Sequence, residues 1–486
     1  MRNAPGTAAR GPRQARAATG SRPGAGLLAV LALALLAGCA RYEAKPLDTH
    51  AALPDAPRKV LVDPASLPFP KLAGHVFDPG DGLDETETAM LAVVNNPDLR
   101  TARADAGVSH AQAFAAGLLP DPQVGLSEDF PLRDVPGSNY TAYSVGLSYD
   151  LNALLTHEVV LEAGRASVRQ ADLGLVWQEW QTASRARLLF ARIVSGQRLE
   201  RLLAADAALL EERQARMDRA LDAGDVTAAA AGADLAALAD ATGRLSTQRR
   251  ALAKDRHDLN LLLGLAPETR LELVGEPYSP SLDEGLVARR LADLAQRRAD
   301  LLALKWGYES QDAKYRKAIL DQFPALNLGF NRASDTSNVQ TFGFSVTMSL
   351  PLFDRNRGNI AVAKATRERL YDDFQARLAQ AGSDVARLLD DLRLLRARLA
   401  ELDATLPRLD RAEAAARKAA DAGEIDEQSY LSLHAARSAK LAERITLAQS
   451  LAEQRLALET TLGCDPSVLE KVAAGDVPAR HEEAPR

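Results

Sequence analysis

The sequence is poor in residues that form disulfides, metal centres and aromatic cores. It contains 2 cysteines and 4 methionines among 486 residues, and aromatic residues make up 5 % of the chain. Two cysteines are too few for a disulfide or zinc framework, and four methionines are too few for a soft-metal relay. The 7 histidines are scattered, with no two of them three or four residues apart. We therefore expect no metal site and no cofactor.

Short catalytic motifs are also missing. The sequence contains no GxSxG, HExxH, Walker A or GxGxxG pattern, so it offers no nucleophile elbow, zinc-protease helix or phosphate-binding loop. The formal net charge of −6 provides no basic footprint for nucleic acid. We predict that the protein is not an enzyme and binds no nucleic acid.

A secretion signal occupies the amino terminus. Five arginines precede an apolar run from Gly26 to Ala37, which is too short to span a bilayer and is typical of a signal-peptide core. The run ends in Leu36-Ala37-Gly38-Cys39, which resembles a bacterial lipobox. We predict a signal peptide over 1–38 and a lipoprotein acylated at Cys39, for example with palmitate. An ordinary secretory signal with an incidental cysteine is the alternative. Ala40, in place of an aspartate, favours the outer membrane.

Two further segments flank the body of the chain. Proline and glycine cluster between Pro54 and Gly82, and we interpret residues 39–83 as an extended strap that leads from the lipid anchor. The charged residues 473–486 are expected to form a disordered tail.

The body contains an internal duplication. Asp222-Ala223-Gly224-Asp225 recurs 199 residues later as Asp421-Ala422-Gly423-Glu424, and Leu263-Gly264 recurs at the same offset as Leu462-Gly463. A period this long exceeds the roughly 20 to 50 residues of a solenoid unit. We predict two large repeats, 84–267 and 283–466, arranged with pseudo-symmetry.

Each repeat contains a long helical hairpin. Between Leu378 and Leu409 the apolar residues alternate in steps of three and four, which is the heptad seam of a coiled coil. Gly224 and Gly423 fit the left-handed position at which a helix ends and the chain reverses. Pro407 is expected to interrupt and bend its helix. The predicted outgoing helices are 156–223 and 359–422, and the predicted returning helices are 226–263 and 425–462.

Four strands are expected at the other end of the hairpins, at about 122–130, 140–151, 325–332 and 340–350. Their apolar residues alternate with small polar ones, as in Phe342, Phe344 and Val346. In a soluble sheet such an apolar face covers a core, whereas in an outer-membrane barrel it faces lipid. A membrane sheet cannot leave its edges in lipid, and barrels begin at about eight strands. Several chains must therefore pool their strands: two would give eight, and three would give twelve and a conduit.

Several motifs resemble those of the TolC-like outer-membrane efflux proteins. They are Asn96-Pro97-Asp98-Leu99, the corner Leu118-Leu119-Pro120-Asp121-Pro122 and the two Ala-Gly-acid tips. The segment from Ser349 to Gly358 is similar to the strand-to-helix corner of the CzcC-like and CusC-like branch, which serves heavy-metal efflux. The resemblance covers about residues 84–466. The first repeat departs from it at the corresponding corner, Asp150-Leu151-Asn152, which puts the geometry of that corner in doubt.

This resemblance implies a fold that is mainly α with membrane β. Duplicated helix–β-hairpin–helix repeats would form, as a homotrimer, a twelve-stranded transmembrane β-barrel and a long α-helical barrel. The duct would sit in outer-membrane lipid and dock, through a periplasmic adaptor (membrane fusion) protein, onto an inner-membrane RND-type pump. It would conduct substrates passively, heavy-metal cations according to the branch, or drugs and other organic compounds.

The resemblance places adaptor contact or a gate at the periplasmic tips. The tip residues are Asp222, Gly224, Asp225, Asp421, Gly423 and Glu424. A threefold ring of such carboxylates could bind cations and restrict anions. Alternatively they are solvated helix-end residues, with Asp225 and Glu424 favourably beginning the next helix.

Other classes of protein stay open. A periplasmic adaptor would show one helical hairpin flanked by β-rich segments. A lipid-anchored enzyme or a coiled-coil scaffold that merely sits in the periplasm is the other alternative.

Overall fold

The computed structural model describes residues 42–49, 53–132, 140–277, 283–464 and 468–469. The chain divides into two units, Met1–Ala52 and Leu53–Arg486. In the first unit residues 42–49 are exposed and have no regular secondary structure. The predicted signal peptide, the lipidation site Cys39 and the tail 473–486 lie outside the described residues.

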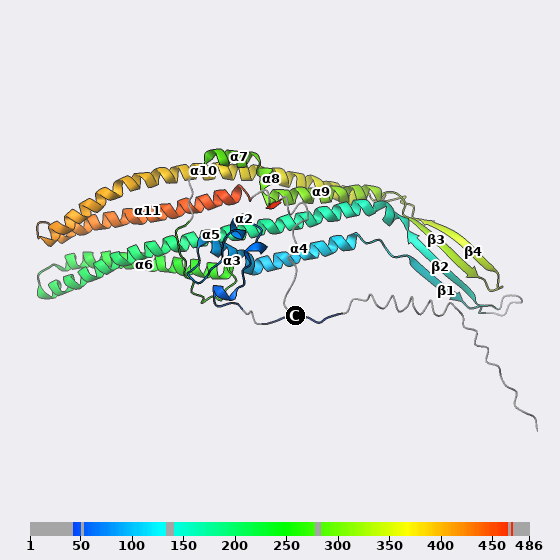
Figure 1. Ribbon diagram of the computed structural model, residues 1–486, viewed down its shortest axis with the longest axis horizontal. Helices are drawn as coiled ribbons and strands as arrows, with labels where there is room; N and C mark the ends of the chain where they lie inside the picture. The colour runs from blue at the N-terminus through cyan, green and yellow to red at the C-terminus, as the bar shows by residue number, and fades with distance from the viewer. Residues whose placement is uncertain (1–41, 50–52, 133–139, 278–282, 465–467, 470–486) are drawn as a thin grey trace, which may run out of the picture. The chain divides into compact units, whose positions relative to one another are not determined.

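Two long helical hairpins dominate the second unit (Figure 1). The first consists of α5 (Leu151–Ala223) and α6 (Ala228–Leu262), and the second of α10 (Arg357–Asp421) and α11 (Glu427–Thr461). The predicted ranges agree with these helices to within five residues at each end. Helix α10 continues through Pro407, where we expected an interruption.

The heptad seam of α10 explains why this hairpin forms. Val385, Leu388 and Leu392 are buried against Leu451 and Leu458 of α11. An apolar stripe with this spacing keeps one face of a long helix against its partner over many turns. The hairpin is therefore a packed coiled coil within one chain.

Shorter helices lie along the half of the hairpins that leads to the sheet. They are α2 (Pro70–Ala73), α3 (Glu85–Asn95), α4 (Pro97–Ala116), α7 (Glu284–Ala292), α8 (Leu294–Arg297) and α9 (Ala299–Leu320). Helix α4 packs on α5, and α9 packs on both α5 and α10. Asn96 begins α4, because its side chain accepts a hydrogen bond from Leu99 N at 2.9 Å and Pro97 supplies the first helical residue.

The segment that we expected to be an extended strap is folded against the helices from Leu53 onwards. It contains two short 3₁₀ turns, Pro57–Lys59 and Pro64–Ser66, and helix α2. Phe69 is buried and stacks edge-on against Trp180 of α5, with ring centroids 5.1 Å apart. Leu67 and Leu72 join Phe69 in one buried cluster with residues of α3 and α5, and their burial gives this segment a fixed path that its proline and glycine content did not reveal.

Four antiparallel strands form one open sheet in the order β1-β2-β3-β4. They are β1 (Gln123–Asp129), β2 (Ala142–Asp150), β3 (Leu326–Ser334) and β4 (Gln340–Met348). Strands β1 and β4 are its two edges. The two strand-to-helix corners differ. Asp150 ends β2 and caps α5 directly. Eight residues separate β4 from α10, and two of them, Arg355 and Asn356, have φ near +50°.

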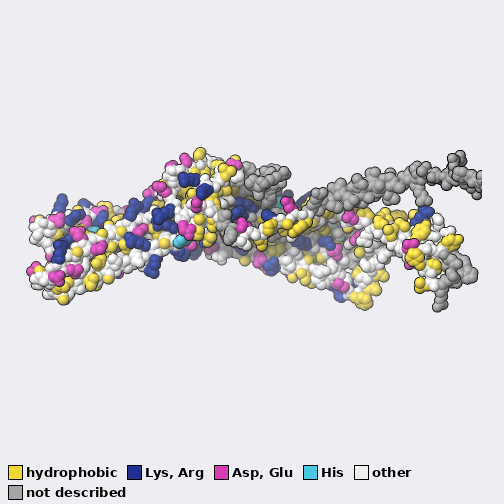
Figure 2. Space-filling view, turned by 90° about the horizontal axis from the view of Figure 1, so that it is seen from below, with side chains coloured by type: hydrophobic (Ala, Val, Ile, Leu, Met, Phe, Trp, Pro, Cys, Tyr) yellow, Lys and Arg dark blue, Asp and Glu magenta, His cyan; other side chains and the backbone are white. Residues whose placement is uncertain are grey.

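One face of this sheet is apolar and exposed. The register aligns Val124, Leu147, Phe330 and Phe344 across all four strands. Phe342 is 78 % exposed and Phe344 is 61 % exposed. Gly146, Gly329, Asn331 and Ser345 belong to the opposite face. Figure 2 shows hydrophobic side chains gathered at the sheet end, on the right, and mixed charges at the helical tips, on the left.

No helix in the described part of the chain combines the length and the apolar character that crossing a membrane requires.

Candidate functional site at the tips and between the hairpins

Both tips close in the same way. Gly224 and Gly423 have φ values of +81° and +73°, in the left-handed region that strongly favours glycine. The next residue donates back to the helix in each case: Asp225 N to Ala220 O and Glu424 N to Ala419 O, both at 2.8 Å. These contacts satisfy carbonyls at the helix end and reverse the chain.

The six predicted tip residues are all exposed, and both tips lie at the end of the hairpins away from the sheet (Figure 1). Asp225 and Glu424, however, do not begin the returning helices. Thr227 and Asp426 cap them instead, by accepting hydrogen bonds from Ala230 N and Ser429 N. The bond from Ser429 N holds the pKa of Asp426 below its ordinary value. Asp225 and Glu424 thus stand in the turn itself, two residues before each cap.

Residues that sequence reasoning did not select join the two hairpins. Helices α5 and α11 run antiparallel and share a series of polar contacts, which we call the α5–α11 ladder. Its rungs are Arg187–Glu459 at 3.0 Å, Arg192–Glu453 at 2.8 Å, Asp206–His434 at 3.2 Å and Arg213–Glu427 at 3.0 Å. In three rungs α5 supplies the cation, and in the Asp206–His434 rung the polarity is reversed.

Arg213 is the most buried cation of the ladder, with 8 % of its side chain exposed. Its Nε donates to Asp234 of α6 at 2.8 Å, and its Nη2 donates to Gln428 of α11 at 3.1 Å. Together with Glu427, these partners come from both hairpins. A buried guanidinium with several charge-assisted partners fixes geometry, because loss of one partner leaves a buried charge.

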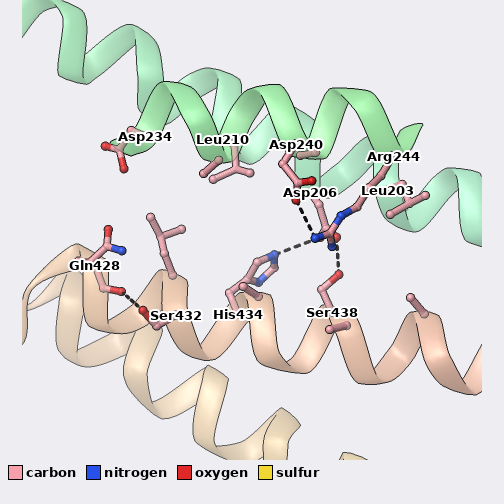
Figure 3. Close-up of a pocket in the computed structure, with 16 residues that line it drawn as sticks. Leu203, Asp206, Leu210, Asp234, Asp240, Arg244, Gln428, Ser432, His434 and Ser438 are labelled. Atoms are coloured by element: carbon pink, nitrogen blue, oxygen red, sulfur yellow. Dashed lines mark hydrogen bonds and ion pairs between the residues drawn. The ribbon is translucent and has the colours of Figure 1, made fainter. Parts of the chain in front are cut away.

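His434 forms a second junction, about two turns further from the tip. Its Nε2 lies 3.2 Å from Asp206 Oδ1 of α5, and its Nδ1 lies 3.1 Å from Glu413 Oε1 of α10. Ser438 donates its hydroxyl hydrogen to the other oxygen of Asp206. Figure 3 shows His434 and Ser438 pointing from α11 towards Asp206. Hydrogen bonding to Asp206 and to Glu413 raises the pKa of His434, against the opposing effect of burial.

A cavity of about 310 Å³ lies beside these residues, between α5, α6 and α11. Alanines line much of it, among them Ala237, Ala435 and Ala439. Its three carboxylates are paired: Asp206 with His434, Asp234 with Arg213, and Asp240 with Arg244 at 2.6 Å (Figure 3). The cavity therefore leaves the two hairpins incompletely packed on each other near the tips.

One signal in the sequence could have identified part of this site. Glu413 and His434 each stand 10 residues from the turn pair Gly423-Glu424. Asp410 and Arg437, which form an ion pair at 2.6 Å, each stand 13 residues away. Acids and bases at equal distances from a hairpin turn face each other. The contacts across to α5 carry no such signal.

One group of possible metal ligands exists among the described residues: His75, Asp84 and Glu87 have ligand atoms within 4.8 Å of one another. The carboxylates already serve as the capping box of α3. Asp84 accepts from Glu87 N at 2.7 Å, and Glu87 accepts from Asp84 N at 2.9 Å. The arrangement is explained by the start of this helix.

Comparison with known proteins finds a family model that matches part of the chain. Residues 291–463 match the sequence model of the family described as outer membrane efflux protein. That segment comprises 173 of the 486 residues and lies within the second predicted repeat. Among curated protein sequences no significant match is found.

Solved structures share the fold of nearly the whole body. CusC has a TM-score of 0.65 and 17 % identity, covering 88 % of this chain and 100 % of that chain. VceC from Vibrio cholerae has a TM-score of 0.64 and 16 % identity, covering 78 % of this chain and 96 % of that chain. The CmeC outer membrane channel of Campylobacter jejuni has a TM-score of 0.65 and 16 % identity, covering 81 % of this chain and 90 % of that chain. The mainly helical fold is thus that of these outer-membrane proteins, and no branch is singled out.

Proposed function

We propose that this protein is the outer-membrane exit duct of a tripartite efflux system. The observation that carries the proposal is the open four-stranded sheet with an exposed apolar face, placed at one end of two long helical hairpins. The family match over 291–463 and the fold shared with outer-membrane channels support it. We extend that family to the whole body, as the repeats 84–267 and 283–466.

Assembly follows from the edges of the sheet. Strands β1 and β4 present unpaired backbone groups, which lipid cannot satisfy. In a homotrimer, β4 of one chain pairs with β1 of the next and closes a barrel of twelve strands. The apolar face then contacts outer-membrane lipid, and the small polar face lines water. The hairpins continue as an α-helical barrel into the periplasm.

Heat-modifiable migration tests this assembly. Outer-membrane extracts should contain a trimer that resists mild detergent and dissociates on boiling. A monomer in the soluble periplasmic fraction would instead favour a periplasmic adaptor or a coiled-coil scaffold. The presence of two hairpins with strands at their far ends argues against both of these.

Anchoring at Cys39 is part of the proposal. The acylated cysteine would hold the chain in the outer membrane, and residues from Leu53 onwards lead into the folded body. Metabolic labelling with an alkyne-tagged palmitate should mark the wild-type protein and fail to mark Cys39→Ala. Labelling of that variant would show that the anchor lies elsewhere.

The partners follow from the tips. Exposed turns at Gly224 and Gly423 are free to contact a periplasmic adaptor protein, which would connect the duct to an inner-membrane RND-type pump. Asp222, Asp225, Asp421 and Glu424 would then form rings of carboxylates at the entrance, able to concentrate cations. Crosslinking from photoreactive residues at positions 224 and 423 in cells should capture the adaptor.

Heavy-metal cations are the substrates that we propose, on the strength of the corner from Ser349 to Gly358 and the acidic tips. Efflux of drugs and other organic compounds is the second candidate, because CmeC fits the fold as well as CusC does. A deletion strain should become sensitive to zinc, cobalt, cadmium, copper or silver and keep its tolerance of antibiotics and dyes. The reverse pattern would leave the duct in place and refute the metal assignment.

A further inference from the structure

Polar contacts join the two hairpins along α5 and α11, whereas the hydrophobic clusters of α5 with α6 and of α10 with α11 lie within each hairpin. One hydrophobic cluster joins α5 and α6 through residues such as Ile193 and Leu252, and another joins α10 and α11 through residues such as Val385 and Leu458. Both clusters lie in the halves of the hairpins away from the tips. Beyond them, α5 meets α11 at the Asp206 and Arg213 rungs, beside the cavity of about 310 Å³. This end of the contact therefore combines ion pairs with a few apolar side chains, among them the buried Leu431 of α11 and Leu203 of α5.

The geometry of His434 specifies a protonation state. Both ring nitrogens face carboxylate oxygens, Asp206 Oδ1 at 3.2 Å and Glu413 Oε1 at 3.1 Å. An ionised carboxylate accepts hydrogen bonds and cannot donate one. Neutral imidazole carries one N–H, so it can satisfy only one of the two carboxylates and turns a lone pair towards the other. Only the imidazolium donates to both.

We propose that protonated His434 is a pH-controlled latch that holds the first hairpin against the second near the tips. The proton allows one side chain of α11 to bind α5 and α10 at once. Loss of the proton removes one of these contacts and places a nitrogen lone pair against a carboxylate. The hairpins then separate more readily as the pH of the surrounding compartment rises.

The charged groups around His434 support this direction. Asp206 faces it from α5 and Glu413 from α10, and Tyr430 lies one turn away on α11 with ring centroids 6.0 Å apart. The nearby cations make their short contacts elsewhere, Arg437 with Asp410 at 2.6 Å and Arg244 of α6 with Asp240 at 2.6 Å, although Arg437 also attracts Glu413 and Asp206 at longer range. The carboxylates therefore dominate, and they raise the pKa of His434 above its ordinary value.

The sign of the effect follows from that raised pKa. A histidine that is easier to protonate in the folded state stabilises it fully below the unfolded pKa of about 6.5. The contribution is lost as pH rises through the folded-state value. The latch is thus closed at mildly acidic pH and released at alkaline pH. Ser438 continues to donate to Asp206, so release by His434 alone is partial.

The purpose of the latch, though not its existence, rests on the proposed function. In an exit duct, separation of the hairpins near the tips would widen the periplasmic entrance. The latch would then make the entrance respond to periplasmic pH.

Distance measurements between the two hairpins test the latch. Spin labels at two exposed positions, Ala229 of α6 and Ala414 of α10, are placed in full-length protein with buried Cys464 replaced by alanine. Labelled chains are diluted with unlabelled ones, so that distances within one chain dominate. Between pH 5.5 and pH 9 we expect the ratio of separated to joined hairpins to rise by about 5- to 30-fold, the factor that corresponds to one lost charged contact.

Three variants and one control variant extend the test. His434→Gln should be separated to the same extent at both pH values, and adding Ser438→Ala should increase the separation. His434→Lys, which stays charged, should remove the pH response. His110→Gln is the matched control, because His110 also lies against a carboxylate, Asp172 at 2.8 Å, but within the first repeat. It should respond to pH as the wild type does.

A distance distribution that does not change with pH in the wild type would overturn the latch. So would a pH response that His434→Gln retains. Conductance of the same samples in planar bilayers is a separate readout. Distances that respond to pH in a protein that conducts no ions would refute the duct and leave the latch standing.

Discussion

Arg213 provides the sharpest test of how the hairpins are joined. Replacing it with methionine keeps much of the side-chain volume and removes the guanidinium that binds Asp234, Glu427 and Gln428. Asp234, whose side chain is 11 % exposed, is then left without this cation. Breaking a buried ion pair in this way costs about 3 to 5 kcal/mol.

Hydrogen exchange of individual amides measures this loss of stability in the helices that Arg213 joins. At about 1.4 kcal/mol for each factor of ten, a loss of at least 3 kcal/mol speeds exchange by more than about 100-fold, provided that exchange occurs through local opening. The affected amides should be those of α6 from Ala228 to Leu245 and of α11 from Glu427 to Ser438. Amides of the buried cluster around Val385 should keep their protection.

Arg216 offers a matched control one turn along the same helix. It also binds Glu427, at 2.5 Å, but its side chain is 42 % exposed. An exposed pair contributes about 0 to 1 kcal/mol, so Arg216→Met should change exchange by less than about fivefold. The double variant Arg213→Met with Asp234→Leu should recover most of the loss, because it leaves no buried carboxylate. Equal effects of Arg213→Met and Arg216→Met would refute the argument from burial.

The other predictions concern the sheet, the turns and the tip carboxylates. Phe344→Arg, on the apolar face of the sheet, should cost about 2 to 4 kcal/mol in a membrane barrel and deplete the heat-modifiable trimer. Thr347→Arg, on the polar face, should be tolerated. Equal yields of trimer from the two variants would contradict a lipid-facing role for the apolar face. Gly224→Ala should destabilise its turn by about 1 to 2 kcal/mol because φ is +81° there, whereas Gly232→Ala inside α6 should stabilise that helix by about 0.5 to 1 kcal/mol. Amide exchange in α6 measures both effects. If the two variants changed stability with the same sign, the turn would not require glycine. Asp421→Asn combined with Glu424→Gln should lower cation selectivity, measured as a reversal potential in a salt gradient, and an unchanged potential and conductance would remove these residues from the gate.

Much of the fold was predictable because its signals are local. The three-four steps from Leu378 to Leu409 predict a helix with one buried face, and the structure buries Val385, Leu388 and Leu392 on it. Gly224 and Gly423 mark the turns because their φ values strongly favour glycine. Alternation at Phe342, Phe344 and Val346 likewise predicts a strand with one apolar face.

The contacts between the hairpins could not be predicted, because they join distant parts of the chain. Arg187 and Glu459 are 272 residues apart, and each is one of many charged residues on a long helix. Which of these face each other depends on how the two hairpins are rotated, and heptad spacing does not specify that rotation. His434 has no histidine neighbour in the sequence, and its two carboxylate partners, Asp206 and Glu413, become apparent only in the structure.

Local sequence signals also did not decide which of two nearby residues caps each returning helix. Asp225 and Asp426 are both acids near a helix start, but only the second caps its helix, with Thr227 taking that role in the first repeat. Apolar residues do not recur at a regular spacing between Leu53 and Leu83, so the sequence pattern did not predict the burial of Phe69 against Trp180.

Conductance of the purified full-length protein in planar lipid bilayers tests the central claim most directly. We predict discrete, uniform steps of current from preparations that migrate as heat-modifiable trimers, and none from Phe344→Arg preparations that fail to assemble. A folded trimer that inserts into the bilayer without conducting ions would contradict the assignment as an exit duct.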